Sequence, residues 1–390
     1  MNAWRALWTV FAKELKDALR DRRTLMVVLI TSIAIGPLTL VMLSTLIDKF
    51  EKRAEAREIV AIGIERAPTL RNFLERQTYA IKAAPVDWET QLKESRLGDP
   101  VVVIPANFEE ALAHGDAPVV EVVYSSANAR AQSGVGRVER ILQGLSQEHA
   151  ALRLIARGVT PSLLNVLQVD EHDVADNAAR AAQLTGMLPY FVLMAMLYGA
   201  LNAALDTTAG ERERGSLEPL LATPAPRGAL VVGKWGAVLS VALLIAVLSC
   251  LSFIPAQRLL RSESLAALFR FGAGEAAAFV ALLAPLAAAL AATMMAIAIR
   301  CKTFKEAQAS NSVVLLGVSL VPMIGLFGQE GEAAWHRWVP GLAQTTLMNR
   351  VLKGSPIGFV DVAPGAVVCL GITALALLFV SHQLVRRAAQ

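Results

Sequence analysis

The sequence predicts an α-helical polytopic membrane protein with six transmembrane helices and an extracytoplasmic α/β domain inserted between the first and second spans. Three observations lead to this fold class. Hydrophobic residues make up 55% of the 390-residue chain and charged residues only 18%, whereas soluble domains are about 45–50% apolar and about 25% charged. Six segments reach or approach the roughly 20 apolar residues that a helix needs to cross a bilayer. A long polar segment separates the first of these from the second.

The six predicted spans contain no Asp, Glu, Lys or Arg. They comprise residues 25–47, 184–205, 235–255, 276–299, 307–327 and 363–381. The first has an apolar run of 23 residues, against about 7–15 in the apolar region of a signal peptide. We therefore expect the first segment to be retained as a span.

The distribution of basic residues beside the spans predicts the orientation, because Lys and Arg are enriched in cytoplasmic loops. Fifteen Lys and Arg residues flank the spans on the side of the two termini, and six lie in the two short loops on the opposite side. We expect a multi-pass protein of the plasma (inner) membrane with cytoplasmic N- and C-termini, including a tail at 382–390. The basic balance fits loops near anionic lipid, and no basic patch interleaved with aromatic residues indicates nucleic-acid binding.

Residues 1–24 are predicted to form a cytoplasmic amphipathic helix. Its apolar stripe consists of Trp4, Leu7, Trp8, Phe11, Leu15 and Leu19, which recur at helical spacing. Such a helix either lies in the membrane interface or packs on the bundle, and the sequence leaves both alternatives open.

Residues 48–183 form the predicted extracytoplasmic domain, and strands alternating with helices favour an α/β fold there. The predicted strands are Ile59–Ile64, Thr78–Ala83, Pro100–Pro105 and Val119–Tyr124, and the predicted helices are Glu89–Leu97, Ala106–His114 and Ala127–Arg157. The histidines of this domain, His114, His149 and His172, lack metal-ligand spacing. We expect no catalytic residue, cofactor or metal site.

The stretch Gly228–Lys234 fits the pattern G-x4-G-K of a phosphate-binding loop. That loop also needs a preceding strand and a Ser or Thr after the lysine, but Trp235 follows here. Proton pumps and ion-coupled transporters usually carry ionisable residues at membrane depth, and the predicted spans have none. If this chain moves a solute, the energy must come from elsewhere.

The predicted cytoplasmic segment 206–234 contains a short helix signal. Ser216 can cap a helix that begins at Leu217, on which Leu217, Leu220 and Leu221 form a small apolar face. A short amphipathic helix between two spans suits the groove of a partner, although a loop on the lipid surface has the same pattern.

The run G-E-R-E-R-G-S-L-E-P-L-L-A-T-P within this segment resembles the cytoplasmic coupling segment of type-2 ABC exporter permeases, in particular of the sodium-extrusion (NatB-like) branch. The stretch Lys13–Asp17 and the layout of one span, a large domain and five spans are also similar to that family. The resemblance implies a permease subunit without ATPase activity of its own, a separate ABC ATP-binding subunit and a second permease half, which makes a homodimer or a heterodimer. It implies efflux of a substrate that the sequence does not identify, with Na⁺ as the name attached to the branch. The residues that it places at or near the ATPase contact are Glu211, Arg212, Glu213, Arg214, Gly215, Leu217, Glu218, Leu220 and Leu221.

Two other classes of function are weighed against this one. A membrane sensor or receptor with an extracytoplasmic ligand-binding domain would need a cytoplasmic output domain, and the longest predicted cytoplasmic piece is under 30 residues. An intramembrane enzyme would need a nucleophile, a metal or paired acids inside the bundle, and the predicted spans offer none.

Overall fold

The chain folds into two units, a helical unit of residues 1–48 and 174–390 and an α/β unit of residues 49–173. The structure is a computed structural model that describes residues 2–20, 22–55, 57–164, 185–216, 219, 225–262, 265–266, 269, 271–327 and 332–387. Helix α2 (Arg22–Glu55) contributes residues to both units.

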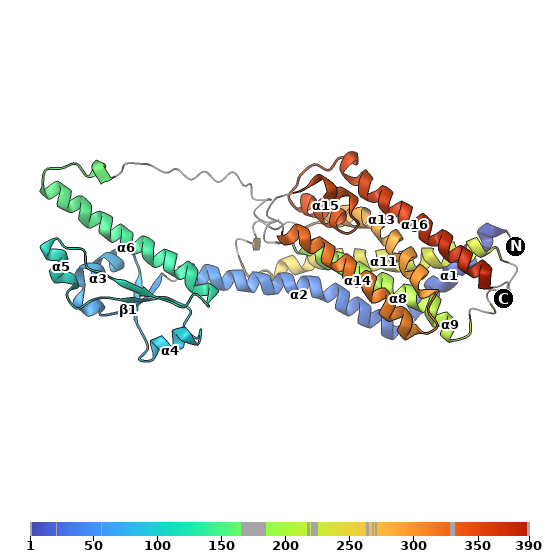
Figure 1. The fold of residues 1–390 in the computed structure, drawn as a ribbon, viewed down its shortest axis with the longest axis horizontal. Helices are drawn as coiled ribbons and strands as arrows, with labels where there is room; N and C mark the ends of the chain where they lie inside the picture. Colours follow the sequence, from blue (N-terminus) through green and yellow to red (C-terminus); the bar gives the residue numbers. More distant parts are fainter. Residues whose placement is uncertain are drawn as a thin grey trace. The chain divides into compact units, whose positions relative to one another are not determined.

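The helical unit is a bundle of long apolar helices that run side by side (Figure 1). Its main members are α8 (Leu188–Leu205), α11 (Arg227–Ala256), α13 (Ala273–Ala298), α14 (Phe304–Phe327) and α16 (Phe359–Arg387). In the described part of the chain, five helical stretches are long and apolar enough to cross a membrane: Leu188–Glu213, Arg227–Leu259, Ala273–Ala298, Phe304–Gly325 and Phe359–Val385. The predicted first span, 25–47, lies within α2, is not among these five and stays a prediction.

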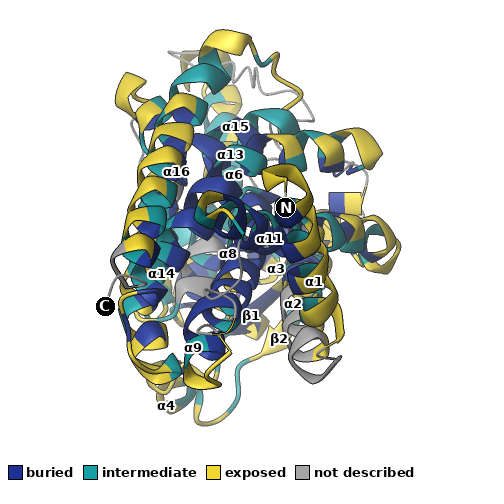
Figure 2. Ribbon diagram, turned by 90° about the vertical axis from the view of Figure 1, so that its right-hand side faces the viewer, coloured by how far each residue is buried: buried dark blue, intermediate teal, exposed yellow. Residues whose placement is uncertain are grey.

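Burial divides the bundle into inner and outer helices. The most apolar stretch of α8 is 72% buried, whereas that of α16 is 17% buried and that of α14 is 22% buried. Figure 2 shows α14 and α16 at the left with exposed outer sides, and the buried residues of α8 and α13 nearer the middle of the view. Because apolar side chains on the outer sides would be unfavourable in water, these surfaces are suited to lipid.

The bundle helices extend beyond the predicted apolar runs. Helix α8 continues through the π-helix η3 (Asp206–Gly210) into α9 (Glu211–Glu213), and α11 begins at Arg227 rather than at Trp235. Both ends of the predicted segment 206–234 are therefore helical, because a helix does not stop where its residues become polar. The short helices α15 (Leu342–Leu352), η4 (Gln257–Leu259) and η5 (Ala334–Trp338) were not predicted.

The α/β unit contains a four-stranded sheet in the order β2-β1-β3-β4. Its strands are β1 (Glu58–Ile62), β2 (Ala80–Ala83), β3 (Val101–Val103) and β4 (Glu121–Val123). Strand β1 is parallel to β2 and β3, while β4 is antiparallel to β3. Each predicted strand overlaps one of these four. The predicted helices correspond to α4 (Trp88–Lys93), α5 (Phe108–His114) and α6 (Ala129–Ala156), followed by η2 (Pro161–Leu164).

The sheet is covered on both faces, as its apolar strands require. Ile59 and Ala61 of β1 pack with α5, α6 and the unpredicted helix α3 (Pro68–Arg76), which follows the short turn η1 (Ile64–Arg66). Val60 and Val101 point to the opposite face, where they meet Leu92 of α4. The alternation follows from the two-residue period of a strand, and Figure 1 shows α4 on the other side of the sheet from α3 and α6.

Candidate functional site

Four charged side chains meet inside the helical unit where α8, α11 and the N-terminal helix α1 (Ala3–Arg20) come together. We call this group of Lys13, Glu14, Glu211 and Lys234 the buried charge junction. The Lys234 Nζ atom donates to Glu14 Oε1 at 2.9 Å, to Glu211 Oε2 at 2.5 Å and to the Thr207 carbonyl of η3 at 3.1 Å. The side chains of Lys234, Glu14 and Glu211 are only 6%, 4% and 9% exposed.

Lys13 lies at the surface side of the junction and pairs with both of its carboxylates. Its Nζ atom lies 2.9 Å from Glu211 Oε1 and 3.1 Å from Glu14 Oε1. Partial burial by itself would lower the pKa of Lys13, but the hydrogen bonds and charges of Glu211 and Glu14 outweigh it and hold that pKa above its ordinary value. With two cations and two carboxylates the junction is neutral, which is the condition under which charges are tolerated in a poorly solvated interior.

Helix α1 packs on α11 through a face of small residues. Ala6, Val10 and Glu14, spaced four apart, are its buried residues, and a Cβ atom on Gly233 of α11 would lie 3.0 Å from the Leu7 carbonyl and 3.1 Å from Val10. The absence of a side chain at Gly233 thus permits the close approach that brings Glu14 to Lys234.

The two tryptophans of the predicted stripe lie elsewhere on α1, whereas Phe11 faces Gly236 of α11. Trp4 is 67% exposed and Trp8 is 50% exposed. The helix therefore packs on the bundle, one of the two alternatives left open, but not through its tryptophans. Leu15 and Ala18, farther along α1, pack against the core of the bundle.

The helix that carries Glu211 ends in a Schellman motif. Gly215 has φ of +68°, its N–H donates to the Arg212 carbonyl, and the N–H of Ser216 donates to the Glu211 carbonyl. This backbone favours glycine at the position after the helix cap. The Ser216 hydroxyl also donates to the Glu211 carbonyl, at 3.1 Å. The structure thus gives Gly215 a role in ending the helix.

The same short helix also binds the connection between α13 and α14. Arg212 Nη1 donates to the Cys301 carbonyl at 2.6 Å. Glu213 Oε2 accepts from the N–H of Phe304 at 2.8 Å, at the first residue of α14. A carboxylate is favourable at a helix N-terminus. Arg214 turns back to Asp206 at 3.1 Å and is 71% exposed. The segment Glu211–Arg214, which continues α8, therefore contacts three other helices, α1, α11 and α14.

The predicted contact residues fall into three groups. Glu211 is buried in the junction, and Arg212 and Glu213 bind the loop before α14. Arg214 and Gly215 are exposed. Leu217, Glu218, Leu220 and Leu221, which include the predicted apolar face, lie outside the described residues.

Sequence reasoning missed the pairing of Glu14 with Lys234. Glu14 lies in the predicted amphipathic N-terminal helix, and Lys234 is the lysine of the G-x4-G-K pattern. The usable signal was a lone lysine at the start of an apolar helix, which has to find an acid when it is buried. The partner is 220 residues away in the chain, and spacing rules reach only within one helix.

The described residues contain no group of three or more His, Cys, Asp and Glu arranged to hold a metal ion. The cysteines Cys250, Cys301 and Cys369 are free and buried. The charges of the buried charge junction neutralise one another, and their ion pairs connect α1, α9 and α11.

Comparison with known proteins adds two similarities that cover most of the chain. The profile of a family described as ABC-2 family transporter protein matches residues 8–381. The chain is also 28% identical over 331 residues to the ABC transporter permease protein NatB of Bacillus subtilis (strain 168), an alignment that covers 82% of each chain.

Proposed function

The chain belongs to the ABC-2 family of transporter proteins, and we propose on that basis that it is the permease subunit of an exporter driven by ATP hydrolysis in a separate subunit. The family and the apolar helices make it a multi-pass membrane permease. The ATP-binding partner, the direction of transport and the substrate belong to the proposal.

The observation that carries the proposal is the attachment of one cytoplasmic segment to several helices at once. Glu211 binds Lys13 of α1 and Lys234 of α11, while Arg212 and Glu213 bind the loop that leads into α14. A push on this segment would therefore move α1, α8, α11 and α14 together. A transporter powered from outside the membrane needs such a connection, because a partner biases a conformational equilibrium only through contacts that differ between the states.

The roles that we propose for the residues of this segment follow from how exposed their side chains are. Glu211, Arg212 and Glu213 hold the segment in place, and Gly215 turns the chain toward residues 217–221. Leu217, Leu220 and Leu221, with Glu218 and exposed Arg214 beside them, are proposed to contact the ATP-binding subunit. In this proposal the two termini are cytoplasmic, α2 supplies a sixth span, and a second permease half completes the transporter.

Co-purification with the ATP-binding subunit tests the contact. Replacing Leu217, Leu220 and Leu221 by Asp should abolish retention of that subunit on the tagged permease, because three carboxylates cannot enter an apolar groove without a large desolvation cost. A matched control replaces Leu152, Leu163 and Leu164, which are exposed leucines of the α/β unit, by Asp and should retain the subunit.

A triple variant at 217, 220 and 221 that binds the subunit and supports transport as the wild type does would refute the proposed contact. Transport is measured in inverted vesicles that contain both subunits, with and without ATP. Na⁺ is the first substrate to assay because the resemblance points to the sodium-extrusion branch. If the vesicles accumulate a solute other than Na⁺, and this accumulation needs ATP but not Na⁺, that solute is the substrate and the coupling proposal stays intact.

A further inference from the structure

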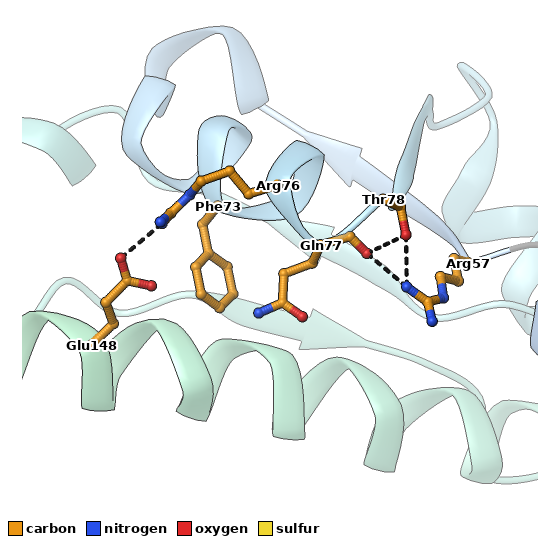
Figure 3. Close-up of a pocket in the computed structure, with 6 residues that line it drawn as sticks. All are labelled: Arg57, Phe73, Arg76, Gln77, Thr78 and Glu148. Carbon is orange, nitrogen blue, oxygen red and sulfur yellow. Dashed lines mark hydrogen bonds and ion pairs between the residues drawn. The ribbon is translucent and has the colours of Figure 1, made fainter.

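A polar hollow opens on the α/β unit at the C-terminal end of α3, beside α6. Its volume is about 290 Å³, and it is lined by Arg57, Phe73, Arg76, Gln77, Thr78 and Glu148. Figure 3 shows Glu148 and Arg76 at one side, Arg57 and Thr78 at the other, and Phe73 and Gln77 between them. All six residues belong to the same unit, so the hollow is a feature of one folded body.

The charges of the lining favour an anion. Two guanidinium groups and one carboxylate leave a net charge of +1. Arg76 Nη2 binds Glu148 Oε1 at 2.8 Å, and the Arg76 guanidinium lies 5.8 Å from the centre of the Phe73 ring. Arg76 is thus held by a carboxylate and by an aromatic face before any ligand arrives.

Among the described residues, the hydrogen bonds of the Arg57 side chain involve one of its nitrogens. Its Nη1 atom donates to the Gln77 carbonyl at 3.0 Å and to Thr78 Oγ1 at 2.6 Å. The interactions of the described residues do not engage Nε or Nη2 of Arg57. Two adjacent N–H groups on a fixed guanidinium match the two oxygens of a carboxylate or phosphate.

The backbone of the hollow is strained at two of its lining residues. Among the described residues other than glycine, only Arg57, Thr78 and Ser95 have positive φ, with values of +41°, +61° and +57°. Positive φ is a genuine outlier for a β-branched residue such as Thr78. Such strain is concentrated at ligand sites, where the surrounding structure enforces it. Here the Arg57 side chain binds Thr78 and so holds that residue in place. The Ala80 N–H donates to the Arg57 carbonyl at 2.9 Å and so holds the backbone of Arg57.

We propose that this hollow is a binding site for a small solute that carries an oxyanion, a carboxylate or a phosphate, with Arg57 as its principal donor. The hollow is at the small end of the range for ligand pockets, about 300–1,000 Å³, so the ligand is of metabolite size. The side-chain amide of Gln77 supplies a further hydrogen-bond donor, whereas the Thr78 hydroxyl already donates to the Gln77 carbonyl. The inference concerns the α/β unit alone and does not depend on the proposed transport function.

The test is a thermal-shift titration of the purified full-length chain with sodium succinate or sodium orthophosphate at constant ionic strength, with choline chloride as the salt control. A saturable rise in melting temperature is expected for at least one anion, with half-saturation below about 1 mM. Response to succinate alone assigns a carboxylate, and response to phosphate alone assigns a phosphoryl group.

Three variants separate binding from general salt effects. Arg57→Gln should weaken the anion response about ten- to hundredfold, the range for losing a charged hydrogen bond. Glu148→Gln should strengthen it about two- to fivefold, because it removes the one negative charge of the lining. Arg71→Gln, an exposed arginine of α3 outside the hollow, should leave it unchanged.

The opposite sign expected for Glu148→Gln keeps the test decisive even if Arg57→Gln fails to fold. A wild-type chain with no saturable response to either anion overturns the inference. So does a folded Arg57→Gln variant with wild-type affinity, or a Glu148→Gln variant that binds no more tightly than the wild type.

Discussion

Replacement of Lys234 by Met is the sharpest perturbation of the buried charge junction. Methionine keeps the unbranched shape of the lysine side chain and removes its charge. The variant leaves Glu14 and Glu211, which are 4% and 9% exposed, with Lys13 as their only cation in the junction. The Thr207 carbonyl also loses a donor.

The size of the effect follows from what remains buried. Removing one partner of a buried ion pair costs about 3–5 kcal/mol, because the other charge stays unpaired in a poorly solvated site. At about 2–4 °C per kcal/mol for a unit of this size, the melting temperature should fall by on the order of 10 °C. The exposed pair of Arg214 and Asp206 provides the comparison, and Arg214→Met should cost about 0.2–1 kcal/mol.

Neutralising one acid should rescue the variant. The double variant Lys234→Met with Glu14→Gln restores a junction of zero net charge and should recover at least half of the lost melting temperature. The assay is thermal unfolding of the purified chain in detergent, followed by tryptophan fluorescence. A Lys234→Met variant that melts within about 2 °C of the wild type, under 1 kcal/mol on the same scale, would refute the reasoning. A double variant no more stable than the single one would also refute it.

Further perturbations act on the same region. Gly233→Leu should detach α1 from α11 and make α1 sensitive to protease. Gly228→Leu is the control and should leave α1 protected, because a side chain there would meet nothing within 4 Å. Equal protection of α1 from protease in the two variants would contradict the packing described. Arg212→Ala removes the donor to the Cys301 carbonyl. If the chain works with an ATP-binding subunit as proposed, this variant should leave ATP hydrolysis by the complex intact and reduce transport per ATP severalfold. An unchanged ratio of transport to hydrolysis would show that the loop before α14 moves independently of Arg212. Because the pKa of Lys13 is raised on folding, its stabilising effect is fully present below the ordinary lysine value of about 10.4 and is lost only as pH rises through the higher folded value. The difference in melting temperature between wild type and Lys13→Met should therefore stay constant from about pH 6 to 9, within which lysine remains charged, and a decline across that window would be inconsistent with the raised pKa.

The α/β unit was largely predictable because its signals are local. The apolar runs of β1 and β3 are bounded by Gly and Pro, and the alternation of strands and helices marks the fold. Helix α3 was missed because its apolar residues Leu70, Phe73 and Leu74 occupy too short a stretch for a helical period to be evident. Only the structure shows that Arg57 and Thr78 adopt positive φ, since neither residue type indicates it.

The membrane helices were predictable in number and order for the last five spans, but their ends were not. Hydropathy identifies the apolar middle of a span. It does not identify the polar ends of the helix, such as Arg227 at the start of α11 and Glu211 at the end of the helix that continues α8. The family resemblance selected the segment from Glu211 to Leu221, of which the structure describes residues 211–216 and 219. What it did not provide was the reason for the segment's rigidity, which lies in α1 and in Lys234, far away in the sequence.

The π-helix at Asp206–Gly210 has a consequence for the direction in which Glu211 points. A π-turn inserts one more residue per turn than an α-helix, and each residue of an α-helix advances the side chain by about 100°. If the same residues from α8 to Glu213 formed an uninterrupted α-helix, the helix axis would be unchanged, but Glu211 would be turned by about 100° and would face away from Lys234. The wide turn therefore acts as a rotational offset: it lets a helix whose sides are fixed by packing in the bundle present an acid toward α1 and α11 at its C-terminal end.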